Sequence, residues 1–298
     1  MRKQLIAMVI LPLLVYNCHE KTNIDSSGEN VLLAKEVTVS SPVLIDNEQN
    51  PEWTASFKHK EFFDTLFHRA RAKEFVVYGG VAADFEDIEL QNIMEEEDLL
   101  RKTTLKTDDG IDKSTKEILF YERWDFNNKS YLFSKEVIGW CPIANWKQDG
   151  VDKRQKVFYV YPKINSRGSK IAESIIYEVP WYFEYPTTTT GFDKKAFFKY
   201  IIDGINAGTL EAYDPIYLVD KSKRKFKPEE LAKYIEQELN PGKIEFYLSS
   251  MLFEEDWYFD ENTLSIQKDV KSIAFVHEPY DSGKGTFSKK ILFFIFPK

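Results

Sequence analysis

Hydrophobic residues recur with a helical period in two stretches of the second half of the chain. In residues 193–206 the large apolar side chains fall on one helical face: Phe197, Phe198, Ile201, Ile202 and Ile205. Gly208 follows, a residue that suits the left-handed stop of a helix. A second apolar period begins after Pro228, and proline is favoured in the first turn of a helix. We therefore predict helices over 193–206 and 228–239.

Runs of aromatic and β-branched residues follow the helical stretches and predict strands. They lie at about 118–126, 131–143 and 155–161, and again at about 243–253, 256–259, 264–276 and 289–296. A helix is predicted ahead of the first set too, with a second helix over 84–100 and a polar loop over 102–115. Helices followed by a series of antiparallel strands are typical of the α+β class.

The same pattern occurs twice at a nearly constant spacing. Residues 60–66 match 195–201 and residues 157–163 match 292–298 at an offset of 135, whereas residues 120–126 match 253–259 at an offset of 133. Three colinear blocks at one spacing indicate an internal repeat. We predict two tandem units, at 57–165 and 192–298, joined by a connector at 166–191 that contains a strand on the first unit or between the two.

The repeat pairs positions that we expect to be structurally equivalent. These are Phe62 with Phe197, Tyr78 with Tyr213, Trp124 with Trp257, Phe126 with Phe259, Phe158 with Phe293, and Pro162 with Pro297. Each unit should pack its N-terminal helix, accompanied by the second helix, on an antiparallel sheet, with the paired aromatic residues buried. The two prolines should end the same strand, because proline cannot donate to a continuing ladder.

Residues 1–18 have the layout of a secretory signal sequence. Arg2 and Lys3 precede an apolar stretch, Leu5 to Tyr16, that is too short to span a bilayer as a helix. The end of this stretch resembles the lipobox of bacterial lipoproteins, although Asn17 stands where a small residue is usual. Lipidation of Cys18 is the favoured interpretation, and ordinary cleavage or a retained anchor are the alternatives. Residues 19–56 are predicted to be a tether, with room for a short strand or two in 31–44.

Charge and composition narrow the classes of partner. Forty Lys and Arg against 48 Asp and Glu give a net charge of −8, which does not fit a phosphate backbone, so nucleic acid is not expected. Two Cys and four His leave almost no ligands for a zinc site, and we predict neither a metal nor a cofactor. The 23 Phe, 16 Tyr and 6 Trp fit β-rich packing.

No residue spacing typical of a catalytic site is present. Cys141 lies between Trp140 and Pro142 in an apolar strand, which favours a buried structural thiol. The strands at 158–161 and 293–296 carry aromatic residues on both faces, and the face away from the core must meet a helix, the other unit or a partner. We predict a non-enzymatic protein. The alternatives are a lipoprotein that binds a glycan or peptide through exposed aromatic rings, and a hydrolase with dispersed acidic residues.

Several segments of the repeat carry a family resemblance. They are the helix and strand that end in Tyr213-Asp214-Pro215, the turn Trp257-Tyr258-Phe259-Asp260, the strand Gly139-Trp140-Cys141-Pro142-Ile143, and the strand Phe158-Tyr159-Val160-Tyr161-Pro162. Together they resemble the GldN/PorN family, the gliding-motility and type IX secretion proteins of Bacteroidota. The resemblance implies a GldN-like lipoprotein with two units, in a structural or adaptor role at the periplasmic face of the outer membrane. It implies protein partners from the secretion or gliding machinery, and it supplies no catalytic residues.

Overall fold

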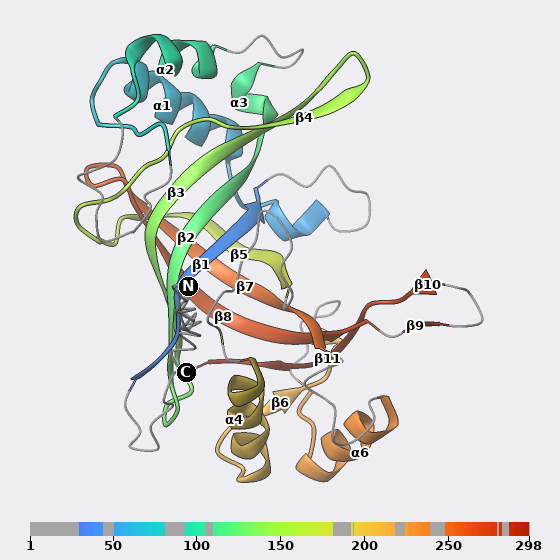
Figure 1. Ribbon diagram of the computed structural model, residues 1–298. Helices are drawn as coiled ribbons and strands as arrows, with labels where there is room; N and C mark the ends of the chain where they lie inside the picture. The colour runs from blue at the N-terminus through green and yellow to red at the C-terminus, as the bar shows by residue number, and fades with distance from the viewer. Residues whose placement is uncertain are drawn as a thin grey trace, which may run out of the picture.

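A long, curved antiparallel sheet forms the middle of the molecule, and helices cover its two ends (Figure 1). The computed structural model describes residues 30–43, 51–80, 93–104, 110–180, 192, 194–217, 224–238, 248–278, 280–281 and 286–297. The predicted signal sequence with Cys18 lies outside these residues, as do parts of the predicted tether and connector.

The long strands of the sheet are hydrogen-bonded in the order β1-β2-β3-β8-β7-β5. Their bounds are β1 Asn30–Pro42, β2 Thr115–Asn127, β3 Phe133–Gln148, β8 Ser265–His277, β7 Leu248–Asp260 and β5 Ser169–Pro180. Shorter strands extend it: β4 Val151–Lys156 pairs with β3, β11 Lys290–Ile295 pairs with β8, and β6 Ala212–Tyr213 pairs with β11. β9 Tyr280–Asp281 and β10 Thr286–Phe287 form a separate small ribbon.

The helices gather at opposite ends of the sheet (Figure 1). One end holds α1 His59–Arg71, α2 Glu96–Thr103 and α3 Ile111–Ser114, and the other holds α4 Lys194–Asn206 and α6 Pro228–Glu238. A single turn, η1 Pro51–Thr54, precedes α1. α4 and α6 agree with the predicted helices. Of the helix predicted over 84–100, residues 84–92 lie outside the described residues. α2 begins at Glu96, where three acidic residues suit the positive end of a helix dipole, and α3 lies in the predicted polar loop.

Two segments that we assigned to linkers belong to the sheet. β1 lies within the predicted tether, in the part where a short strand was expected. Val37 and Val39 are fully buried, and Thr38 between them is partly exposed, as the alternation of a strand requires. β5 lies within the predicted connector and pairs with β7, which belongs to the predicted second unit. The strand expected in each of these segments is therefore present, and β5 pairs with the second predicted unit.

The two ends of the sheet follow the same pairing order. β1, β2, β3 and residues 157–161 make up what we call the first half, and β5, β7, β8 and β11 the second half. β2 and β7 begin 133 residues apart, and α1 and α4 begin 135 apart. Tyr78 bridges to Tyr159, and Tyr213 pairs with Phe294. The halves join where Lys135 of β3 lies opposite Lys268 of β8.

Both faces of the aromatic-rich strands are covered within the chain. Phe158 and Phe293 are fully buried in one extended apolar cluster that joins α1, α4 and one face of the sheet. On the opposite face, Tyr159 packs in a small cluster with Cys141, and Phe294 packs in another with Tyr213. The second face therefore meets other parts of this chain.

Candidate functional site

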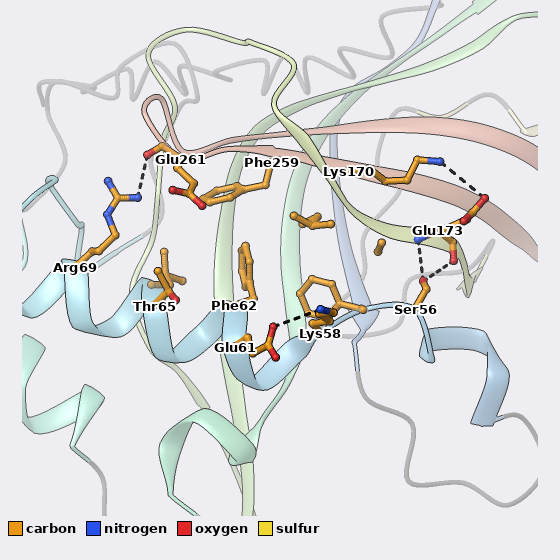
Figure 2. Close-up of a pocket in the computed structure, with 14 residues that line it drawn as sticks. Ser56, Lys58, Glu61, Phe62, Thr65, Arg69, Lys170, Glu173, Phe259 and Glu261 are labelled. Atoms are coloured by element: carbon orange, nitrogen blue, oxygen red, sulfur yellow. Dashed lines mark hydrogen bonds and ion pairs between the residues drawn. The ribbon is translucent and has the colours of Figure 1, made fainter.

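A groove of about 520 Å³ separates α1 from β5 and from the turn between β7 and β8. Its floor is apolar and is formed by Phe57, Phe62, Leu66, Ile171, Ala172 and Phe259. Figure 2 shows Phe62 and Thr65 on α1 pointing across the groove toward Phe259. The volume falls within the range of about 300–1,000 Å³ that is usual for binding pockets.

Hydrogen bonds hold the two walls of the groove together at its ends. Ser56 Oγ donates to the backbone carbonyl of Glu173 at 2.5 Å, and the Glu173 N–H donates back to Ser56 Oγ at 2.8 Å (Figure 2). At the far end, the Arg69 guanidinium donates to the backbone carbonyl of Glu261 at 3.1 Å. These bonds connect the turn before α1 to β5, and α1 itself to the β7–β8 turn, so the groove is preformed.

The rim of the groove carries no net charge. Three cations, Lys58, Arg69 and Lys170, alternate with three carboxylates, Glu61, Glu173 and Glu261. A polar rim with balanced charge around an apolar floor is typical of a surface that binds protein segments, and it gives no preference for an anion or a cation.

The matching positions of α4 carry different residues from those that line the groove. At an offset of 135, Tyr200 stands where Thr65 lines the groove, and it packs partly buried against the core. Gly204 stands where the first half has Arg69, and a Cβ atom there would lie 2.5 Å from the hydroxyl of Tyr131. Phe62 is consequently only partly buried, so our expectation of a burial equal to that of Phe197 was wrong.

The remaining paired residues lie as follows. Trp124, Trp257, Phe158 and Phe293 are fully buried, Phe126, Phe259 and Tyr213 are buried, and Tyr78, Pro162 and Pro297 are partly buried. Pro297 lies just after β11, and Pro162 follows the segment that bridges to β3 at Val160. Two pairs of these rings make equivalent contacts between the halves. Phe62 of the first half lies 5.0 Å from Phe259 of the second, and Phe197 of the second lies 5.2 Å from Phe126 of the first, between ring centroids.

A buried charge quartet, Glu122, Lys135, Glu255 and Lys268, lies where β3 meets β8. All four side chains are shielded from solvent. Lys135 Nζ lies 2.7 Å from a carboxylate oxygen of Glu255, and Lys268 Nζ lies 2.5 Å from one of Glu122. Each lysine thus pairs with the glutamate of the other half. The indole N–H of Trp124 donates to Glu122 at 2.7 Å, and that of Trp257 donates to Glu255 at 2.9 Å.

Aromatic rings complete the surroundings of the quartet. The Lys135 ammonium lies 3.1 Å from the ring centroid of Phe253, and the Lys268 ammonium lies 3.3 Å from that of Phe120, so both make cation–π contacts. The hydroxyl of Tyr177 donates to Glu255 at 3.0 Å and accepts from Lys135 at 2.9 Å. Sequence reasoning missed the quartet, although Glu122 and Glu255 occupy matching positions of the repeat block at 120–126 and 253–259.

The charge of Glu255 is favoured in the folded state. Burial acts to raise the pKa of its carboxyl, but the ammonium groups of Lys135 and Lys268 outweigh burial and hold the pKa below its ordinary value. Glu117 behaves similarly: burial raises its pKa, and hydrogen bonds from Arg154 and Ser40 outweigh that effect and lower it. Both carboxylates therefore link folding to pH.

We expect the free energy of unfolding to fall as the pH drops below the ordinary glutamate pKa of about 4.3. In that window the unfolded chain binds more protons than the folded chain, because the folded pKa of Glu255 is lowered, so stability rises with pH and is lost on acidification. Urea unfolding between pH 7 and pH 3 measures the slope. E255Q should flatten it relative to E97Q, which removes an exposed charge on α2. Equal slopes for the two variants would contradict this linkage.

Other candidate chemistry is absent from the described part of the chain. Cys141 is fully buried, and burial raises the pKa of its thiol to about 12, which confirms the predicted structural role. Within the described residues no three His, Cys, Asp or Glu side chains gather as metal ligands would. None of the described helices has the length and apolar character needed to cross a membrane.

Comparison with known families gives one match. The family of the gliding motility associated protein GldN matches residues 177–298. No curated protein matches the chain. The matched segment begins inside β5 and runs through α4, β7, β8 and β11, which is the second half. Over these residues the chain is similar to that family. The resemblance of residues 57–165 to the same family stays a prediction.

Proposed function

We propose that this protein is a GldN-related component of the gliding-motility and type IX secretion machinery that acts by protein contact and has no enzymatic activity. It is held at the periplasmic face of the outer membrane by a lipid on Cys18. The observation that carries the proposal is the GldN match over residues 177–298, which covers the second half of the fold.

We propose further that the chain consists of two related units. The pairing order of the strands supports this, because β1-β2-β3 in the first half corresponds to β5-β7-β8 in the second. The two tryptophans support it as well, since Trp124 and Trp257 are 133 residues apart and each donates to the glutamate two positions before it. Among the described residues, the open groove lies along α1 of the first unit.

This groove is the proposed contact site, and its occupant is an aromatic side chain of a partner protein. Its floor is apolar, its rim is neutral in charge, and its walls are held in place by hydrogen bonds. In the second unit a tyrosine of the chain itself, Tyr200, stands at the position of Thr65. An aromatic anchor in a preformed pocket, surrounded by a polar rim, is the common arrangement of an interface hot spot.

Filling the groove should therefore abolish partner binding without unfolding the protein. T65Y copies the residue of the second unit, and H68Y places the same side chain on the exposed face of α1. After cross-linking in membranes, mass spectrometry should identify a gliding or secretion component bound to wild type and to H68Y but lost from T65Y. If T65Y retains the component as H68Y does, the groove is not the contact site.

The lipid anchor is tested separately. C18A should move the protein from the membrane fraction to the soluble periplasmic fraction, because one residue carries the acyl chains that hold it. Mass spectrometry of the wild-type N-terminal peptide should show the lipid. Membrane retention of C18A together with an unmodified wild-type peptide would contradict the lipoprotein assignment.

The glycan-binding alternative finds no support in the described part of the chain. Stacking on sugars needs a flat, exposed aromatic platform. Among the described residues the exposed large hydrophobic side chains are all aliphatic, and the rings of Phe62 and Phe259 in the groove meet edge to face, at 75°. The carboxylates of the groove lie at its rim and alternate with cations, which does not favour the hydrolase alternative either.

A further inference from the structure

In the buried charge quartet, the lysine of each half forms its ion pair with the glutamate of the other half. Lys135 and Lys268 lie opposite each other on β3 and β8, a position where like charges repel. The repulsion is relieved because Lys135 reaches Glu255 and Lys268 reaches Glu122. A contact of residue i with j that is matched by a contact of j with i is the signature of a twofold, isologous interface.

The rings around the quartet repeat the exchange. Lys135 lies over Phe253 of the second half, and Lys268 lies over Phe120 of the first. The segments just before α1 and α4 also contact the opposite half. Phe57 of the first half lies 6.1 Å from Trp257 of the second, and Phe192 of the second lies 5.8 Å from Trp124 of the first, between ring centroids. These ring contacts do not involve the two lysines, yet they show the same reciprocity: a contact from the first half to the second is matched by one from the second to the first.

Neither half can satisfy its own buried charges as well as the other half does. Lys268 lies 3.8 Å from Glu255 of its own half but 2.5 Å from Glu122 of the other. The shortest ion pair of Lys135 is likewise with a residue of the other half, Glu255. A buried lysine without its partner carries a large desolvation penalty, so a half that exposes the free edge of β3 or β8 would favour association with a second half.

We infer that each half carries a self-complementary association surface, built on β3 or β8, whose partner is a second half of the same kind. In this chain the partner is supplied covalently, so the protein is a dimer fused into one polypeptide and the surface is already occupied. This inference rests on the two-unit architecture proposed above, but it concerns how the halves recognise each other and requires no external partner.

The test is to cut the covalent link and ask whether the halves stay together. A site-specific protease sequence is inserted after Ile164 in the full chain, and the purified protein is cleaved under native conditions. Ile164 is exposed and lies between residues 157–161 and β5, so β5 stays with the second half. Both fragments should elute together at the size of the uncut protein. Dilution then gives their dissociation constant. Since the assay contains no membrane and no partner protein, its result is independent of the T65Y experiment.

Three variants show whether the crossed ion pairs hold the halves. E255Q should weaken association by about a hundredfold or more, because it leaves Lys135 buried without its anion. K135M/E255Q should recover at least about tenfold of that loss. The control R123Q breaks an exposed ion pair with Glu136 inside the first half, and it should change the dissociation constant by less than about threefold.

Two results would overturn the inference. One is separation of the wild-type fragments on cleavage. The other is an equal effect of E255Q and R123Q, with no recovery in K135M/E255Q. If E255Q fails to fold before cleavage, the uncut double variant gives the same information: restored folding supports a coupled pair across the halves, and an unfolded double variant contradicts it.

Discussion

Truncation of Trp257 to alanine is expected to lower the free energy of unfolding by roughly 3–5 kcal/mol, the range for large buried aromatic residues. The side chain is fully buried, with the ring of Phe120 5.2 Å away between centroids. Its removal leaves a cavity and also deprives Glu255 of the indole donor at 2.9 Å. Because Trp124 is equally buried and donates to Glu122 in the same way, W124A should cost a similar amount.

Chemical denaturation of the two variants measures this effect, with Y258A as the matched control. Tyr258 is the next residue of β7 and is partly exposed. The guanidinium carbon of Arg167 lies 3.7 Å from the centroid of its ring. Loss of the Tyr258 ring should cost about 1 kcal/mol. If W257A costs no more than Y258A, or if W124A and W257A differ by more than about 2 kcal/mol, the two tryptophans do not play equivalent parts in the core.

Replacement of Lys268 by methionine is expected to cost about 3–5 kcal/mol, the usual effect of breaking a buried ion pair. Methionine fills much of the same space, so the loss comes from the carboxylate of Glu122, which stays buried without its cation. Adding E122Q should recover most of this loss, because glutamine removes the charge and still accepts from the indole of Trp124.

A double-mutant cycle of K268M and E122Q isolates the pair. K60M provides the control, since Lys60 and Asp64 form an ion pair on the exposed face of α1, worth about 0.5 kcal/mol or less. Additive effects of K268M and E122Q would show that the two residues do not depend on each other. We expect the coupling free energy between K268M and E122Q to be several times the loss of unfolding free energy caused by K60M.

Local sequence rules predicted much of the fold. Helices α4 and α6 follow from apolar periodicity and from the flanking Gly208 and Pro228, which act within a few residues. The strands β8 and β11 follow from runs of aromatic and β-branched residues, whereas β7 is one continuous strand where two were predicted, at about 243–253 and 256–259. The spacing of 133 and 135 residues between matched blocks is also seen between β2 and β7 and between α1 and α4.

The rest depends on contacts between distant segments, which local rules do not contain. The sequence left room for a short strand in 31–44, but only pairing with β2 shows where β1 lies in the sheet. The groove along α1 exists because Thr65 and Arg69 stand where the second half has Tyr200 and Gly204, a difference whose effect depends on how α1 packs. The quartet was hidden by the ordinary rule that lysine and glutamate lie at the surface.

The central claim is that the two halves form one cooperative body through the β3–β8 junction, and amide hydrogen exchange tests it most directly. Exchange of the backbone amides of Lys135 and Lys268, which lie opposite each other at the junction, should be among the slowest in the protein, because it requires global unfolding. The amides of β1, at the edge of the sheet, should exchange faster. If the junction instead exchanges as fast as β1, the halves open independently and the account is wrong.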